Sequence, residues 1–421
     1  MARRLTVAPG CSSGEARGSY PAGHCEKCGR KRSVMRKRIV FFAPHLLSPT
    51  VGSGGDILFC EIARRIRDHR PEWEVCVVAP DFACSELARY FERTMPFRSG
   101  AGEGRQGSPA SVLTTWLKRL PVAHRVLIEA QPDLVHSTGD FFVDVWPVVF
   151  ARRSRAFAWS GVVHHVNAPP WQRRNSFGVS AVSYVLQRAS FVALRRADSI
   201  SVLNRGVLAQ LCDLGFSRSR IHVVGAGIDV EKFPQIGTSL RERRAVWLNR
   251  LEPTKGIFDL PAIMRYLPRD MAIDVVGRGP QVHVERLRGE IETAGVAQRC
   301  VLHGFLPDEE LRRVLSRAGV FISCSYEEGW GISIAEALAM GLPCVVYDLP
   351  SHREIFGDAI TRVPIGDTRA FAGAIADHIE QLESDAVRQT RHDIARAYSI
   401  EECAARQEEI FAKLIGEMSA V

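Results

Sequence analysis

Short apolar runs alternate with amphipathic stretches along most of this chain. The run Ile39–Ala43 predicts a strand, and the periodic stretch Asp56–Arg67 predicts a helix that follows it. Further strand candidates stand at Val75–Ala79, Leu134–His136, Gly161–His164, Ser199–Leu203 and Ile221–Val224. Strands that alternate with helices indicate parallel βαβ units, so this half of the chain predicts an α/β fold with a doubly wound sheet.

A second series of strands and helices begins near Arg244. Its strand candidates are Ala245–Leu248, Ile273–Val276, Val301–His303, Val320–Cys324 and Cys344–Tyr347, with helices expected at 256–266, 281–294 and 308–318. Between the two series, glycine and proline break the periodicity within Gly225–Arg241. Two doubly wound halves in succession predict two Rossmann-like domains, residues 35–228 and 241–398, that face a cleft.

Composition narrows the class of protein. A chain of 421 residues exceeds one ordinary core, and its 46% hydrophobic content is typical of a globular protein. Residues 241–421 contain 22 Lys and Arg against 28 Asp and Glu, which leaves 33 against 19 in residues 1–240, a net charge of +14. This excess favours attraction to anionic lipid or to a phosphate-bearing acceptor, with solubility as the simpler explanation. A nucleic acid partner is not expected, because no recognition module is present.

The first 34 residues predict a basic, disordered leader, and Met35 resembles a natural start. The leader lacks an apolar h-region, so it does not predict a secretory signal. Cys25 and Cys28, with His24 and Cys11, form the one cluster that suggests zinc, but a single CxxC motif favours a leader without metal. The scattered other cysteines favour a reducing cytosol, and no apolar run reaches the length of a membrane span.

The stretch Tyr326–Pro343 carries the most informative chemistry. Glu328 and Glu336 stand eight positions apart, with Gly329 and Gly331 just after the first carboxylate and an apolar helical run behind them. This order predicts a strand end, a tight glycine loop and a helix N-terminus, whose free N–H groups and dipole suit a phosphate. Carboxylates suit sugar or ribose hydroxyls. A ligand with both phosphates and hydroxyls would use the whole stretch.

This stretch resembles the E-x7-E signature of retaining, nucleotide-sugar-dependent glycosyltransferases with the GT-B fold. The Gly-Trp-Gly insert and the Ala-Leu-Ala-Met-Gly-Leu-Pro exit distinguish it from a chance pair of acids on a solvated helix. The resemblance implies that Glu328 binds hydroxyls of the donor sugar and that Glu336 holds the ribose. It further implies contacts with phosphate or sugar oxygens along Gly329, Trp330, Gly331 and Ile332.

Arg250 and Lys255 follow the first strand of the second series. A guanidinium fork and an ammonium group both suit phosphate oxygens, although a surface pair flanking a turn is the simpler reading of any such spacing. The string around them resembles the G-R-L-x-x-x-K-G motif of the same family, with Asn249 in place of glycine. The resemblance implies that these cations stabilise the departing nucleoside diphosphate.

Three further loops follow predicted strands. Gly54 and Gly55 open the first helix, but Ile57 rules out the G-x-G-x-x-G dinucleotide fingerprint, and a plain tight turn is the alternative to a ligand loop. In the family that this chain resembles, the corresponding loop faces the donor phosphates or the acceptor. Loops at Gly277 and Phe305 are similar to those around the nucleotide base.

A histidine doublet, His164 and His165, lies at the carboxyl end of a predicted strand, where ligands of open α/β sheets collect. The family places a histidine at the corresponding strand end. Strand alternation would point the two rings to opposite faces, so one of them is expected in the cleft. We favour His165 as the ring that hydrogen-bonds a donor-sugar hydroxyl, with a purely structural role as the alternative.

The resemblance implies a retaining, metal-independent hexosyltransferase without a bound cofactor, whose co-substrate is a nucleotide-diphospho-sugar. No D-x-D pair for a catalytic metal occurs. The expected acceptor is a glycan or a lipid-linked glycan of polysaccharide or lipopolysaccharide biosynthesis. The expected location is the cytoplasm, in peripheral contact with the inner face of the membrane. The alternatives are an epimerase or a phosphorylase on the same scaffold, or a non-catalytic partner subunit.

Two helices bear on the partners. The basic amphipathic stretch Tyr184–Arg196 predicts a helix that packs on its own sheet or lies on a lipid surface. In proteins of the resembled family the last helix commonly crosses back to the first domain. Residues 399–421 are therefore expected to form such a helix.

Overall fold

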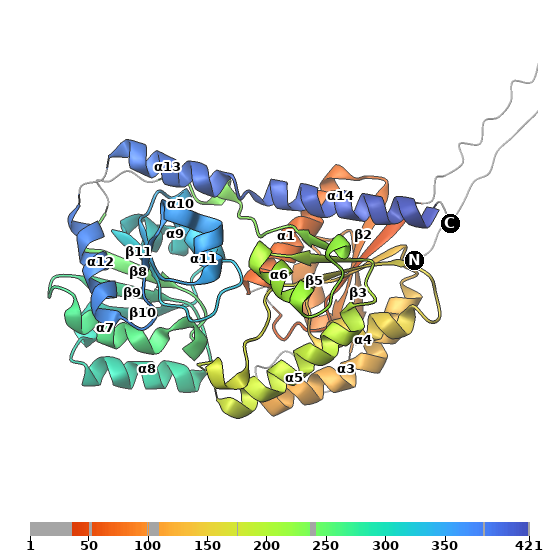
Figure 1. The fold of residues 1–421 in the computed structure, drawn as a ribbon, viewed down its shortest axis with the longest axis horizontal. Coiled ribbons are helices and arrows are strands. Elements are labelled where there is room, and N and C mark those ends of the chain that lie inside the picture. Colours follow the sequence, from red (N-terminus) through yellow and green to blue (C-terminus); the bar gives the residue numbers. More distant parts are fainter. Residues whose placement is uncertain are drawn as a thin grey trace, which may run out of the picture. The chain divides into compact units, whose positions relative to one another are not determined.

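The computed structural model describes residues 36–49, 53–98, 100, 109–174, 176–235, 241–381 and 384–419. Strands of this part of the chain form two parallel sheets, one with seven strands and one with six (Figure 1). The predicted pair of Rossmann-like domains is therefore confirmed. The predicted leader, residues 1–34, with its cysteine and histidine cluster, lies outside the described residues.

The first sheet has the order β3-β2-β1-β4-β5-β6-β7. Its strands are β1 (Lys37–Phe42), β2 (Trp73–Pro80), β3 (Arg93–Phe97), β4 (Leu134–Ser137), β5 (Ala158–Val163), β6 (Ser199–Val202) and β7 (Ile221–Val223). In the centre, Ile39 pairs with Val75 of β2 on one side and with Leu134 of β4 on the other. The strand order reverses between β1 and β4, so the loops after these two strands diverge and open a crevice.

Helices cover both faces of this sheet: α1 (Gly54–His69), α2 (Cys84–Leu87), α3 (Pro109–Glu129), α4 (Phe142–Ala151), α5 (Phe177–Leu194) and α6 (Arg205–Asp213). Ile39 and Phe41 pack into the cluster that contains α1, whereas Val40 and Phe42 pack with α3 and α4 (Figure 1). Because both faces are buried, β1 reads in the sequence as a continuous apolar run and not as an alternating one.

The second sheet has the order β10-β9-β8-β11-β12-β13, which reverses between β8 and β11. Its strands are β8 (Arg244–Leu248), β9 (Ala272–Val276), β10 (Cys300–Gly304), β11 (Val320–Ser323), β12 (Cys344–Tyr347) and β13 (Thr361–Val363). Its helices are α7 (Leu260–Tyr266), α8 (Gln281–Thr293), α9 (Asp308–Arg317), α10 (Ile332–Ala339), α11 (Pro350–Phe356), α12 (Thr368–Glu380) and α13 (Asp385–Arg396). The helix expected from residue 256 begins four residues later, because Gly256 is left-handed with φ 71° and a 3₁₀ turn follows it.

The last helix, α14 (Ile400–Ser419), packs against the first sheet (Figure 1). The ring of Phe411 lies 6.0 Å from that of Phe41, and Arg70 pairs with Glu408 at 2.6 Å. At the crossing, the amide of Ile400 donates to the carbonyl of Ile228 at 2.9 Å. The two segments that connect the domains therefore run side by side.

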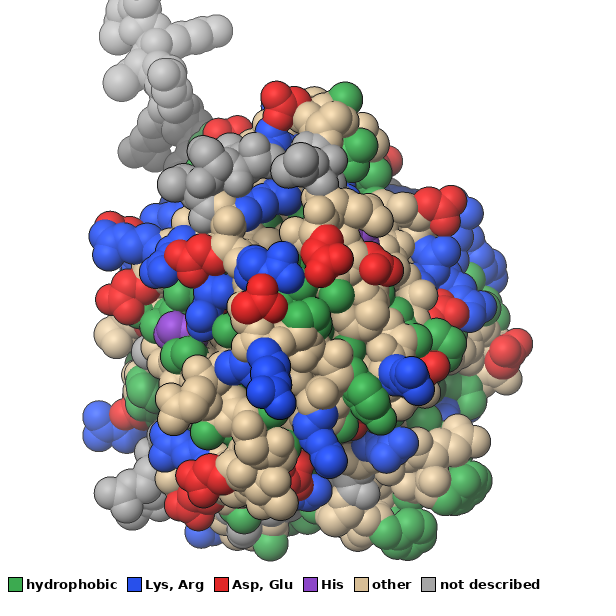
Figure 2. Space-filling view, turned by 90° about the vertical axis from the view of Figure 1, so that its left-hand side faces the viewer, with side chains coloured by type: hydrophobic (Ala, Val, Ile, Leu, Met, Phe, Trp, Pro, Cys, Tyr) green, Lys and Arg blue, Asp and Glu red, His purple; other side chains and the backbone are tan. Residues whose placement is uncertain are grey.

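Among the described helices, α5 alone is long and apolar enough to cross a membrane by length and composition, and a third of it is buried in the fold. The sequence reading found no such run, because Arg188 and several serines interrupt it. Unlike the apolar α5, the surface of the second domain that Figure 2 shows carries interspersed basic and acidic side chains.

Candidate functional site

The switch point of the second sheet brings together two of the predicted site residues. Lys255 lies in the loop after β8, and Glu328 lies in the loop after the neighbouring strand β11. The Nζ of Lys255 donates to the Oε1 of Glu328 at 2.8 Å and to the carbonyl oxygen of Glu327 at 3.0 Å. Both side chains of the ion pair are largely buried, with 12% and 13% of their surface exposed. The pair therefore forms a fixed centre in the crevice.

Two neutral donors complete the environment of Glu328. Asn249 Nδ2 and Ser325 Oγ donate to the same Oε1 at 3.2 and 3.0 Å. Burial alone would raise the pKa of Glu328, but the charge of Lys255 and these hydrogen bonds outweigh it and lower the pKa to about 2. From the sequence, Asn249 was only a replacement for the glycine of the family motif. In the structure its side chain contacts the carboxylate of Glu328.

Glu336 lies one turn into α10, and its pKa is shifted in the opposite direction from that of Glu328. Burial raises its pKa to about 8, the charge of Asp308 raises it further, and Lys232 opposes both. Its carboxylate has no hydrogen-bond partner among the residues that the structure describes. The helix begins after Gly331, which has φ 106° and no capping side chain, so the first N–H groups of α10 stay available. This end of the helix is suited to a phosphate or a sugar oxygen.

Predicted glycines of both domains meet around one histidine. A Cβ atom on Gly329 would lie 2.6 Å from the backbone oxygen of His164, and one on Gly55 would lie 3.3 Å from the Nε2 of that ring. A Cβ atom on Gly54 would lie 3.0 Å from Ile332, the first residue of α10. The backbone contact at Gly329 requires glycine, whereas a Cβ atom at Gly54 or Gly55 would require the facing side chain to shift by a few tenths of an ångström.

The predicted nucleotide loops also lie at carboxyl ends of the second sheet. Gly277 has φ 142°, and a Cβ atom there would lie 1.8 Å from the backbone oxygen of Asn249. Phe305 is 63% exposed, and the guanidinium of Arg278 lies 5.2 Å from the centre of its ring. An exposed aromatic ring beside a cation offers a stacking surface for a flat ring.

The side chains of two predicted residues do not join the ion pair. The indole of Trp330 is 3% exposed and packs on the rings of Phe356 and Tyr398, which leaves its backbone amide, the group expected to contact the donor. Arg250 does not contact Lys255 or Glu328 here. Its guanidinium pairs with Glu252 at 2.9 Å, with 55% of the side chain exposed.

The histidine doublet lies just beyond β5, and the two rings face different neighbours. His164 nests against the start of α1, where burial lowers its pKa to about 4. His165 is exposed to solvent, but other groups surround its ring. Its Nε2 lies 3.1 Å from Asn167 Oδ1. Crowding and the nearby charge of Lys255 lower the pKa of His165 as well. The backbone of His164 lies beside Gly329, so the doublet adjoins the loop that carries Glu328.

The loop that follows the doublet reaches the second domain. Arg173 pairs with Glu327 at 2.8 Å, and the guanidinium of Arg174 lies 4.5 Å from the ring centre of Tyr326. A second contact joins Asn204 Nδ2 to the carbonyl of Gly329 at 2.6 Å. Sequence reasoning missed these residues, and the adjacent arginines at 173 and 174 were the only local signal.

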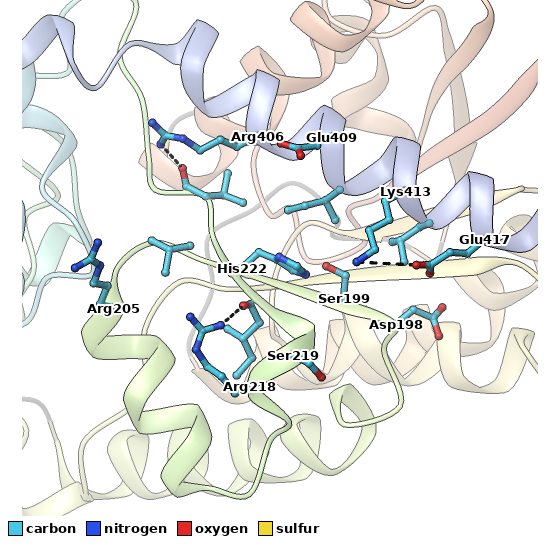
Figure 3. A pocket seen from close by; sticks show the side chains of 15 residues that line it. Asp198, Ser199, Arg205, Arg218, Ser219, His222, Arg406, Glu409, Lys413 and Glu417 are labelled. Carbon is cyan, nitrogen blue, oxygen red and sulfur yellow. Dashed lines mark hydrogen bonds and ion pairs between the residues drawn. The ribbon is translucent and has the colours of Figure 1, made fainter.

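A cavity of about 770 Å³ lies elsewhere, between β7 and α14 (Figure 3). Three of its four Arg and Lys side chains are engaged by the fold: Arg218 donates to the carbonyl of Ile221, Arg406 to the carbonyl of Val224, and Lys413 pairs with Glu417. None of the predicted site residues lines it. No group of three or more potential metal ligands occurs within the described ranges.

Comparison with known families divides the chain as the two sheets do. The family model described as Glycosyl transferases group 1 matches residues 229–399. The model described as Glycosyltransferase Family 4 matches residues 53–232.

Individual proteins agree with these matches. The chain is 25% identical over 287 residues to a GDP-mannose:cellobiosyl-diphosphopolyprenol alpha-mannosyltransferase of Xanthomonas oryzae pv. oryzae, which covers 66% of this chain and 73% of that protein. It is 24% identical to an MMP alpha-(1->4)-mannosyltransferase of Mycolicibacterium hassiacum, over 73% of this chain and 79% of the relative.

Solved structures share the fold. A sucrose-phosphate synthase from Thermosynechococcus elongatus superimposes with a TM-score of 0.76 at 18% identity, over 91% of this chain and all of that chain. HepE of Anabaena, in complex with UDP and glucose, superimposes with a TM-score of 0.70 at 17% identity, over 90% and 100%.

Proposed function

Because the chain belongs to the group 1 glycosyltransferases, we propose that it is a retaining enzyme that transfers a hexose from a nucleotide-diphospho-sugar to a glycan or lipid-linked acceptor. The observation that carries the proposal is the Lys255–Glu328 ion pair where β8 and β11 end, directly before the uncapped start of α10. The Xanthomonas relative is named for a GDP-mannose donor, and HepE was solved with UDP, so these two nucleotides are the first to test.

Glu328 is suited to hold the donor sugar and poorly suited to attack it. Its three hydrogen-bond donors all reach Oε1, which leaves Oε2 to accept from sugar hydroxyls. A carboxylate with a pKa of about 2 is ionised at neutral pH and is a weak nucleophile. This favours retention without a covalent glycosyl-enzyme. The acceptor oxygen would bond to the anomeric carbon as the bond to phosphate breaks, and its proton would pass to the leaving phosphate.

Lys255 and Arg250 are the proposed partners of the leaving diphosphate. The ammonium of Lys255 has three N–H groups, and two of them bond to Glu327 and Glu328, so one remains for a phosphate oxygen. The exposed pair of Arg250 with Glu252 contributes little to stability, so the guanidinium can move to a phosphate at small cost. Glu336 would receive the ribose hydroxyls.

The donor is tested by a thermal-shift panel and a transfer assay. UDP-glucose, GDP-mannose and ADP-glucose with labelled sugars are incubated with the protein and a mixture of lipid-linked and soluble glycan acceptors. We expect one nucleotide to raise the melting temperature and its sugar to be transferred. Glu328→Gln and Lys255→Met should lose transfer by about 10²-fold or more, whereas Lys413→Met on α14 should not. Formation of an epimer or a sugar phosphate in place of a glycoside would reject the proposal.

Two further properties need their own readouts. Retention is read from the anomeric coupling of the product by NMR, and an inverted product would exclude the mechanism above. Metal independence predicts that transfer persists in excess EDTA. A rate that collapses with EDTA and returns with Mg²⁺ would overturn this part of the proposal.

We also propose that the enzyme works in the cytoplasm, in peripheral contact with anionic lipid through α5. The 52 residues from Val145 to Arg196 contain eight arginines and no aspartate, glutamate or lysine. Phe177, Val182, Val185 and Val192 are between 49% and 66% exposed and fall on one side of α5, opposite the buried Gln187 and Leu194. An apolar stripe among cations suits the interface of an anionic bilayer.

Vesicle sedimentation tests this contact. The protein should bind vesicles with 40% phosphatidylglycerol and not pure phosphatidylcholine, and Val185→Asp should weaken binding about tenfold, since burying a charge among acyl chains is costly. Val282→Asp is the matched control, because Val282 on α8 is 65% exposed and Val185 is 63% exposed. Equal binding by both variants and wild type would exclude α5 as the lipid surface. Membrane and soluble fractions of cells test the location.

A further inference from the structure

A buried amide network lies behind His165. Gln187, in the middle of α5, is 7% exposed, and its side chain makes three hydrogen bonds. Nε2 donates to Asp140 Oδ2 at 2.6 Å and to the carbonyl oxygen of His165 at 2.8 Å, while Oε1 accepts from the amide of Asn167 at 2.8 Å. The orientation of the amide is fixed, because its nitrogen faces two acceptors and its oxygen faces a donor.

The same reasoning fixes the proton on His165. Asn167 Nδ2 donates to the hydroxyl of Ser183 at 3.1 Å and lies 3.4 Å from its carbonyl oxygen. Asn167 Oδ1 therefore faces His165 Nε2, and this oxygen can only accept. Nε2 must carry the proton, so in the neutral ring Nδ1 carries the lone pair.

Charges around the network keep the ring neutral. Crowding of the ring, Lys255 and Arg173 lower the pKa of His165, while Glu327 and the hydrogen bond with Asn167 oppose them. At the far end of the network, burial raises the pKa of Asp140 to about 6, with Asp144 raising it and His45 lowering it. Above pH 7, Asp140 is ionised and accepts from Gln187, and His165 is uncharged.

We infer that Gln187, held between Asp140 and Asn167, is a positioning residue that makes His165 present an unprotonated Nδ1 to a hydroxyl of the donor sugar. The inference rests on the proposed function and adds three residues that no motif indicated. It also assigns a direction to the contact: the sugar hydroxyl donates and the ring accepts.

Gln187→Met tests the positioning role by calorimetric titration. UDP-glucose and UDP, and GDP-mannose and GDP, are titrated into wild type, and the pair that binds is used for the variants. Gln187→Met should weaken the nucleotide-sugar about tenfold and leave the nucleoside diphosphate within about twofold, because only the sugar meets His165. Gln407→Met is the matched control, since Gln407 is also buried, at 2%, and bonds Ser201 away from the cleft. It should change neither affinity.

Asn167→Asp tests the tautomer with a variant that preserves the acceptor. A carboxylate beside Nε2 raises the pKa of His165, and the protonated ring cannot accept at Nδ1. The nucleotide-sugar affinity of the variant relative to wild type should fall several-fold from pH 8.5 to pH 6, with no such fall for the nucleoside diphosphate.

The outcomes separate the two claims. Wild type that binds neither nucleotide nor nucleotide-sugar would reject the proposed function. If wild type binds both ligands, the proposed function stands. The positioning inference alone is then overturned in either of two cases: Gln187→Met weakens the binding of both ligands equally or of neither, or the affinity of Asn167→Asp relative to wild type does not change with pH.

Discussion

The ion pair between Lys255 and Glu328 allows a stability change to be worked out in advance. Lys255→Met keeps an apolar stem of similar length and removes the charge. The pKa of Glu328 falls from an ordinary 4.5 to about 2 against the opposing effect of burial, and Lys255 is the leading cause of that fall. A depression of this size corresponds to about 3 kcal/mol of folding free energy at neutral pH.

The sign of the pH dependence follows from the direction of the shift. Because the pKa is lower in the folded state, the contribution is present above pH 4.5 and is lost as the pH falls toward 2. We expect Lys255→Met to lower the free energy of unfolding by about 3 kcal/mol at pH 7 and by about 2 kcal/mol at pH 3.5. The loss has an upper limit, since Glu328 can take up a proton once Lys255 is gone.

Urea denaturation followed by tryptophan fluorescence at both pH values measures this difference. Arg286→Met is the matched control, because Arg286 lies 2.7 Å from its carboxylate, Glu290, close to the 2.8 Å of the Lys255–Glu328 pair, but is 59% exposed on α8. An exposed pair of this kind contributes less than about 1 kcal/mol. The reasoning is refuted if Lys255→Met costs no more than the control, or if its cost is the same at pH 7 and pH 3.5.

Glu336 predicts the opposite pH dependence: its pKa is raised from 4.5 to about 8, so stability is lost as the pH rises from 4.5 through 8. Urea denaturation of wild type and Glu336→Gln should show wild type losing about 2 kcal/mol relative to the variant from pH 6 to 8.5, and a constant difference would contradict this. Gly329→Ala should reduce transfer at least about tenfold, since its Cβ would lie 2.6 Å from the backbone of His164, whereas Gly289→Ala meets nothing within 4 Å and should leave the rate unchanged. Trp330→Ala should lower the free energy of unfolding by about 3–5 kcal/mol, as measured in urea, and a loss below 1 kcal/mol would place the indole outside the core.

Most strands could be predicted from the sequence because both faces of each sheet are covered. A strand buried on both sides has few polar positions, so runs such as Ile39–Ala43 and Cys344–Tyr347 are visible without knowledge of their partners. β3 was missed because it is an edge strand that contains Pro96, and only its pairing with β2 makes it a strand. α4 was missed because Pro147 argues against a helix locally, while packing against the sheet maintains it.

The sequence by itself determined which residue types could form a site: glycines at strand ends, a helix start with free amides, and two carboxylates and two cations near them. Only the tertiary structure decided that Lys255 bonds Glu328, that Arg250 turns to Glu252, and that the indole of Trp330 enters the core. The physical reason is how far apart in the sequence the interacting residues lie. Strand and helix patterns depend on neighbours within a few positions, whereas the Lys255–Glu328 contact joins residues 73 positions apart and exists only because β8 and β11 are adjacent in the sheet.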